Sequence, residues 1–142
     1  MQEIPLRVVG TIRSPFATPL DAPRQGAFTE RESRIEVLPQ YRAGLAGIER
    51  HRRLLVVYWA HAADRERLQY ANGEGVFVGR SPHRPNPLLL TEVELLSVEE
   101  GVLRVKGLDA VDGSPLVDLK PALAEWEGPS GFIGQWDPSL RF

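Results

Sequence analysis

The clearest hydrophobic pattern in the sequence is that of short β-strands. Apolar residues alternate with polar ones over residues 6–12 and 34–38, which is typical of strands with one face in solvent. Residues 54–60 form a continuous apolar run that is too short for a helix of usual length and predicts a buried central strand. Four further apolar segments also predict strands: residues 75–78, 88–98, 102–108 and 115–119. The expected total is therefore about seven strands.

Turn-forming residues separate these segments. Residues 99–101, Glu-Glu-Gly, lie between two apolar segments and predict an antiparallel hairpin, because glycine adopts positive φ angles. Residues 109–113, Asp-Ala-Val-Asp-Gly, predict a second tight connection. Helical periodicity is scarce and is confined to residues 39–48 and 64–70. Many short strands at close spacing indicate a barrel or a sandwich, and we predict a mainly β fold, a small antiparallel β-barrel with short helices.

Composition narrows the class of protein. The 142 residues contain no cysteine, which excludes disulfide scaffolds, thiolate metal sites and cysteine nucleophiles. The longest apolar run is far shorter than a membrane span, and the first residues lack the pattern of a signal peptide, so we expect a single cytoplasmic domain over residues 1–142. Residues 123–142 mix Pro, Gly and Trp without periodicity, and we expect a tail packed on the body or on a partner subunit.

The densest chemical signal is the segment Arg-Ser-Pro-His-Arg-Pro-Asn-Pro at residues 80–87. Proline fixes φ and restricts the residue before it, so the side chains of this segment are held in a stiff loop at low entropic cost. The segment therefore predicts a preorganised binding loop; the alternative is a rigid turn whose charges serve solubility. The net charge of −2 gives no overall attraction to nucleic acid, so any RNA contact needs such a local patch.

Three weaker signals accompany this loop. Residues 109–121 contain three carboxylates and a lysine, and Asp118 and Lys120 share one face of a strand, where they form an ion pair or flank a ligand. Residues 23–26, Pro-Arg-Gln-Gly, form a polar loop. The histidines match no common metal motif, so we expect no metal; they are His51, His61 and His83.

Taken in order along the chain, these segments resemble the TrmO/TsaA-like family, tRNA N6-methyltransferases that act on modified adenosine 37. Residues 80–87 look like the family motif R-S-x-x-R-P-N-P. Residues 108–121 are similar to its motif L-D-x-x-D-G-T-P-x-x-D-x-K-P, with Ser114 in place of threonine. The other similar segments are residues 10–16, 23–25 and 47–61.

The resemblance implies a small β-barrel that binds S-adenosyl-L-methionine without a Rossmann fold, usually as a homodimer with the cofactor close to the subunit interface. It suggests Arg80 for the methionine carboxylate and Asp109 for a ribose or amino group of the cofactor. The residues that it places around the cofactor are Arg24, Gln25, Gly26, His61, Arg80, Leu90, Leu108 and Asp109.

The implied reaction is N6-methylation of threonylcarbamoyl-adenosine 37 in tRNA. The motif candidates for accepting the N6 proton are Asn86, Asp112 and Asp118. The residues expected to contact the tRNA are Arg84, Arg52, Arg53 and Lys120, with Arg50 as a further phosphate contact. A cofactor-binding barrel without turnover and a methyltransferase for another acceptor are the two other functions considered, and we expect no membrane and no DNA partner.

The sequence departs from the family between residues 88 and 90, where Leu-Leu-Leu replaces the usual Ile-Gly-Leu. Glycine lets a ligand approach the backbone closely, whereas Leu89 is bulky. We expect such departures to affect the substrate more than the cofactor.

Overall fold

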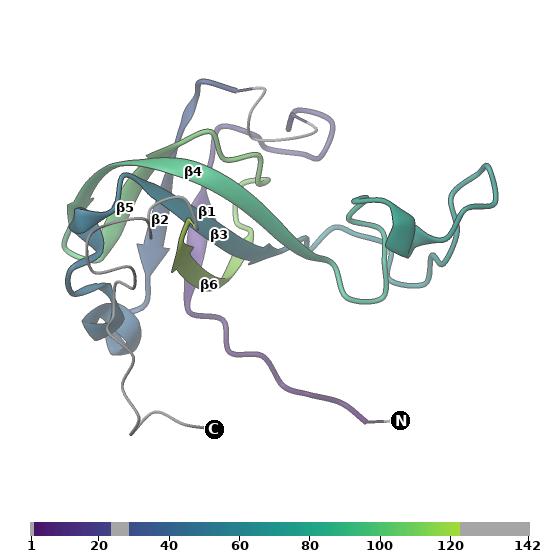
Figure 1. Ribbon diagram of the computed structural model, residues 1–142, viewed down its shortest axis with the longest axis horizontal. Coiled ribbons are helices and arrows are strands. Elements are labelled where there is room, and N and C mark those ends of the chain that lie inside the picture. The colour runs from purple at the N-terminus through teal and green to yellow at the C-terminus, as the bar shows by residue number, and fades with distance from the viewer. Residues whose placement is uncertain (1, 24–28, 123–142) are drawn as a thin grey trace.

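Six antiparallel strands close into a barrel in the computed structural model, which describes residues 2–23 and 29–122 (Figure 1). The order around the barrel is β1-β2-β5-β4-β3-β6. The strands are β1 (Gly10–Arg13), β2 (Glu32–Val37), β3 (Arg53–Trp59), β4 (Leu88–Glu99), β5 (Val102–Lys106) and β6 (Pro115–Pro121). The described residues also form three short 3₁₀ helices: η2 (Pro39–Leu45), η3 (Ile48–Arg50) and η4 (Val76–Val78). The predicted fold class, a mainly β antiparallel barrel, is confirmed.

Strand β3 is the central strand that the apolar run predicts, with β4 on one side and β6 on the other. Alternate residues point to opposite faces of a strand, and Leu54, Val56 and Tyr58 accordingly face the barrel interior. Both Leu54 and Val56 are fully buried. The core into which they pack also receives Ile12, Ile35, Val93, Leu103, Val105 and Leu116.

The predicted hairpin joins β4 to β5. Glu100 and Gly101 form its two-residue turn with φ angles of 48° and 79°. Positive φ at both central positions is the geometry of a type I′ turn, whose twist matches that of paired strands. The predicted hairpin is confirmed, and Gly101 adopts the positive φ angle that the prediction assigned to it.

The loop between β3 and β4 differs from the prediction. Residues 75–78 form no strand: they contain η4, in which Phe77 and Val78 are 81% and 71% exposed. Residues 64–70 form no helix, and the nearest regular structure is an isolated bridge between Gln69 and Gly75. Residues 60–87, the projecting segment, extend away from the barrel (Figure 1). Apolar residues predicted a strand here, but no strand lies beside them in the described structure.

The expected helix at residues 39–48 is η2, a 3₁₀ helix in place of an α-helix. Within the described ranges, no helix is long and apolar enough to cross a membrane. The expected tail over residues 123–142 lies outside the described residues, so its packing stays a prediction.

Strands β1 and β6 close the barrel through a short seam, in which Gly10 pairs with Leu116 and Thr11 with Pro115. Gly10 also pairs with Val37 of β2. A Cβ atom at residue 10 would overlap the carbonyl oxygen of Glu36, so only glycine fits between the two neighbouring strands.

Candidate functional site

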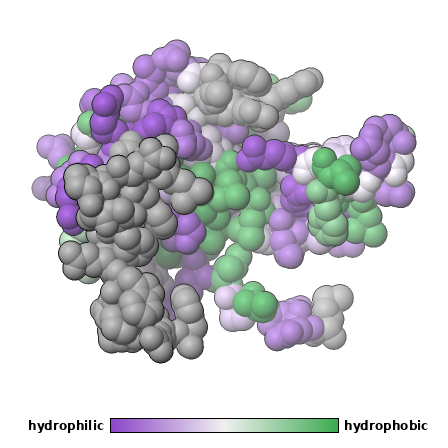
Figure 2. Space-filling view, in the orientation of Figure 1, coloured by the Kyte–Doolittle hydropathy of each residue, from purple (hydrophilic) through white to green (hydrophobic). Residues whose placement is uncertain are grey.

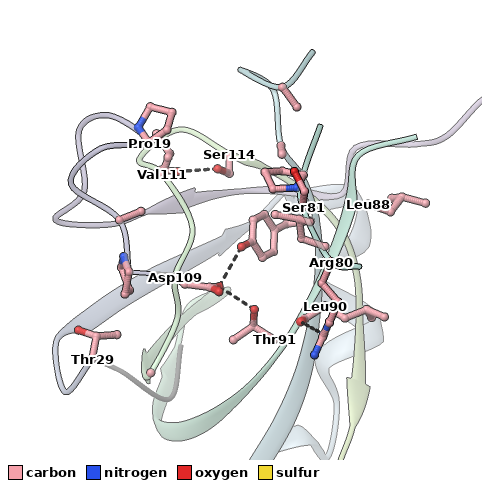
Figure 3. A pocket seen from close by; sticks show the side chains of 18 of the residues that line it. Pro19, Thr29, Arg80, Ser81, Leu88, Leu90, Thr91, Asp109, Val111 and Ser114 are labelled. Carbon is pink, nitrogen blue, oxygen red and sulfur yellow. Dashed lines mark hydrogen bonds between the residues drawn. The ribbon is translucent and has the colours of Figure 1, made fainter. Parts of the chain in front are cut away.

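An open cleft of about 1300 Å³ lies where the projecting segment joins the barrel (Figure 3). Its walls come from the paired ends of β3 and β4, from residues 80–84, and from the connection between β5 and β6. The cleft exceeds the roughly 300–1,000 Å³ typical of pockets for one small molecule. The cleft is therefore large enough for a small molecule together with part of a second ligand.

A partly buried hydrogen-bond cluster centred on Asp109 forms part of the cleft wall (Figure 3). The Tyr58 hydroxyl donates to Asp109 Oδ1 at 2.8 Å, and Thr91 Oγ1 donates to the same oxygen at 2.6 Å. Burial, followed by the negative charge of Asp109, raises the pKa of Tyr58 well above its ordinary value. The phenol therefore remains a hydrogen-bond donor at all physiological pH values.

Arg80 and Leu90 lie beside each other on the other side of β4 from Asp109 (Figure 3). The Arg80 guanidinium donates to the carbonyl oxygen of Leu90 at 3.3 Å, while its side chain remains exposed. Leu88 and Leu90 are 37% and 48% exposed, so the cationic group lies next to an apolar surface. Of the expected cofactor residues, Arg80 and Leu90 thus lie on one face of β4 and Asp109 on the other.

The loop at residues 80–87 is fixed by hydrogen bonds to its surroundings. One terminal nitrogen of Arg84 donates to the carbonyl oxygens of Val76 and Gly79 at 2.7 and 3.1 Å. The Tyr70 hydroxyl accepts a hydrogen bond from the Ser81 amide. Arg84 lines the cleft, and these backbone contacts give it a structural task. Its contact with tRNA stays a prediction.

Arg65 is a second anchor of this loop, and the sequence analysis missed it. Its guanidinium lies 4.9 Å from the centre of the Trp59 ring, a cation–π contact. It also donates to the carbonyl oxygen of Pro85 at 2.8 Å and to Asn86 Oδ1 at 3.4 Å. No local motif marks Arg65, because its partners lie on β3 and in a different part of the projecting segment.

The three motif candidates for proton transfer do not line the cleft. Asn86 is exposed and contacts Arg65. The Asp112 carboxylate accepts the amide hydrogen of Ser14 at 3.0 Å. Asp118 forms an ion pair with Lys120 at 2.9 Å, one of the two arrangements that their spacing allowed. Their catalytic roles remain predictions.

The other expected site residues are distributed as follows. Among those expected to contact tRNA, Arg53 lines the cleft and pairs with Glu92 at 2.7 Å, whereas Arg52 and Lys120 are exposed outside the lining. His61 is an exposed residue of the cleft wall. Three of the expected cofactor residues lie outside the described ranges: Arg24, Gln25 and Gly26.

Two leucines need separate mention. The Leu108 side chain is fully buried in the core, so only its main chain could reach a ligand. Leu89 pairs with Tyr58 across β3 and β4, packs against the core and lines the cleft. No cluster of three or more His, Asp or Glu residues suited to a metal occurs in the part of the chain that the structure describes.

Comparison with known proteins identifies one family. The profile of the tRNA-methyltransferase O N-terminal domain matches residues 11–127. A probable S-adenosyl-L-methionine-binding protein of Methanothermobacter thermautotrophicus is 48% identical over 124 residues, covering 84% of this chain and 90% of that protein. The human tRNA (adenine(37)-N6)-methyltransferase is 44% identical over 59 residues, which cover 42% of this chain and 13% of that protein.

A solved structure shares the fold. The crystal structure of TrmO from Pseudomonas aeruginosa superposes with a TM-score of 0.75 at 26% identity and covers 99% of this chain. The chain in turn spans 64% of the length of that protein. The similarity therefore extends over the described barrel and over only part of the longer relative.

Proposed function

The chain belongs to the family of the tRNA-methyltransferase O N-terminal domain, and we propose that it is an S-adenosyl-L-methionine-dependent methyltransferase of tRNA. The observation that carries the proposal is the family match, which includes both motifs that border the cleft. Within this proposal the acceptor is N6 of threonylcarbamoyl-adenosine 37, and the enzyme works in the cytoplasm without a DNA partner.

The groups around the cleft suit the cofactor. S-adenosyl-L-methionine carries a carboxylate, an ammonium group, a ribose and an adenine. Arg80 offers a guanidinium for the carboxylate, and Asp109 offers an acceptor for a hydroxyl or amino hydrogen. The exposed side chains of Leu88 and Leu90 offer an apolar surface for the remainder. When bound, the cofactor supplies the methyl group.

The chain's contribution to the reaction is positioning. The acceptor N6 is a urea-like nitrogen and a poor nucleophile, so holding it in line with the methyl donor supplies much of the rate. The loop at residues 80–87 is fixed by Arg84 and Arg65, which keeps its groups in place without the acceptor. Asn86, Asp112 and Asp118 remain the proposed acceptors of the N6 proton.

Calorimetry and methyl transfer test the proposal. The protein should bind S-adenosylhomocysteine, and Arg80→Ala should weaken binding by about tenfold, the effect of losing one charge-assisted contact. Arg34→Ala, an exposed arginine of β2, is the matched control. Labelled methyl groups should pass to tRNA that carries threonylcarbamoyl-adenosine and not to an unmodified transcript.

Each result has a defined meaning. Absence of binding at millimolar cofactor would reject the methyltransferase. Binding without transfer to any tRNA would favour the barrel that carries the cofactor without turnover. Equal transfer to both tRNA samples would reject the modified adenosine as the acceptor.

We further propose that the protein is a homodimer, because the projecting segment exposes side chains that favour burial. Phe77, Val78 and Leu68 are 81%, 71% and 63% exposed. Figure 2 shows hydrophobic side chains both on this segment and on the adjoining face of the barrel. A second copy related by a two-fold axis would cover both surfaces.

Light scattering at micromolar concentration should give twice the chain mass of 15.8 kDa. Phe77→Ser should shift the protein toward the monomer, since burial of a phenylalanine side chain contributes about 1.5–3 kcal/mol. Leu38→Ser is the control, because Leu38 lies between β2 and η2, outside the projecting segment. A monomer at all concentrations would contradict the dimer.

A further inference from the structure

We infer that Tyr58 and Thr91 are positioning residues that fix the carboxylate of Asp109 for recognition of a hydrogen-bond donor on the ligand. The donor is a ribose hydroxyl or an ammonium group, either of which a carboxylate oxygen accepts. The inference rests on the proposed binding of S-adenosyl-L-methionine in the cleft, and it adds two residues that no motif identified.

The first argument is the occupancy of the two carboxylate oxygens. Both hydroxyls donate to Oδ1, and no described residue donates to Oδ2. Asp109 is partly exposed and lines the cleft. Among the described residues Oδ2 therefore has no donor, and it belongs to a side chain of the cleft wall, where a ligand can supply one.

The second argument is the rigidity of the two donors. Thr91 pairs with Val56 across β3 and β4, and Tyr58 lies two residues further along the same inner face. Tyr58 is 2% exposed and Thr91 8% exposed, so packing holds both side chains in one rotamer. Asp109, in contrast, belongs to the connection between β5 and β6. Two sheet residues thus fix the side chain of a loop residue.

The third argument is chemical. Tyr58 remains protonated, and a threonine hydroxyl does not titrate, so both groups donate at every working pH. A carboxylate held by two such bonds loses little further conformational entropy when it binds a donor. Preorganisation of this kind increases affinity because less order has to be created on binding.

Isosteric variants test the inference by calorimetry with S-adenosylhomocysteine. Tyr58→Phe and Thr91→Val should each weaken binding by about tenfold, the effect of a hydrogen bond to a charged group. Thr91→Ser keeps the hydroxyl and should restore binding to within about threefold of the wild type. Tyr41→Phe is the matched control, because Tyr41 packs against the core from η2 and does not line the cleft.

A merely structural role is distinguished by coupling. In an Asp109→Asn background the carboxylate is absent, so Thr91→Val should change the affinity by less than about twofold. A tenfold loss of affinity from Thr91→Val in that background would overturn the inference. Unchanged affinity in the single variants, once thermal melting shows that they are folded, would also overturn it. A wild-type protein that binds no S-adenosylhomocysteine would instead overturn the proposed function and this inference with it.

5′-Methylthioadenosine identifies the group that Asp109 recognises, since it retains the ribose and lacks the ammonium group. If Tyr58→Phe weakens the binding of both probes equally, Asp109 recognises the ribose. If it weakens the binding of S-adenosylhomocysteine alone, Asp109 recognises the ammonium group. Either pattern supports positioning, and a loss for neither probe contradicts it.

Discussion

Replacing Asp109 by alanine is expected to lower the free energy of unfolding by about 2–4 kcal/mol. The reason is that one carboxylate oxygen accepts hydrogen bonds from the hydroxyls of Tyr58 and Thr91, both of which are buried. A buried donor left without an acceptor costs about 1–3 kcal/mol, and this substitution leaves two. Water reaching the space vacated by the partly exposed carboxylate limits the loss. Urea denaturation measures it.

Asp109→Asn is the matched variant. Asparagine keeps an oxygen that can accept both hydroxyls, so its loss of stability should remain near about 1 kcal/mol. Both variants lack the charge, and both should lose affinity for S-adenosylhomocysteine. Equal stability of the alanine variant and the wild type would show that the cluster does not stabilise the barrel.

Replacing Gly10 by alanine is expected to cost about 3 kcal/mol, at the upper end of losses from overpacking. The added methyl group would overlap the Glu36 carbonyl oxygen and approach the Leu116 side chain to 3.1 Å. The carbonyl belongs to the backbone of β2, so it cannot move away as a flexible side chain would. Relief requires β1 to shift at the seam that closes the barrel. The change is measured by urea denaturation.

Gly44→Ala provides the control for this substitution. A Cβ atom at residue 44 would have no neighbour within 4 Å, and Gly44 lies in the exposed helix η2. Its stability should stay within about 0.5 kcal/mol of the wild type, as for most surface changes. Similar losses in both variants would show that the effect at residue 10 is not steric.

The strands of the barrel were predictable because their apolar residues are buried in the core of the barrel, as the apolar pattern implies. The run at residues 54–60 and the turn at residues 99–101 each carry a local signal, and both predictions are confirmed as β3 and as the β4–β5 hairpin. Residues 75–78 carry the same apolar signal, but it does not reveal whether a partner strand lies beside them. Phe77 and Val78 are exposed in η4 for this reason.

The candidate site was predictable only in part. Arg80 and Asp109 belong to motifs, and the structure places both at the cleft. Tyr58 and Thr91 look like ordinary strand residues, since the chemical role of each depends on a carboxylate far away in the sequence. One signal was present: by strand alternation Thr91 shares a face with the apolar residues Leu89 and Val93. A polar side chain at a position that faces inward needs a partner.

The seam between β1 and β6 also decides the order in which the barrel can assemble. The hairpin of β4 and β5 closes over two residues, whereas the seam joins segments separated by roughly 100 residues of chain. Closing a longer loop loses more chain entropy, and contacts distant in sequence form slowly. We therefore expect the hairpin to form early in folding and the barrel to close late. Asp109 lies between β5 and β6 and contacts Tyr58 of β3 and Thr91 of β4, so we expect its part of the cleft to form when β6 pairs with β3, before the seam closes.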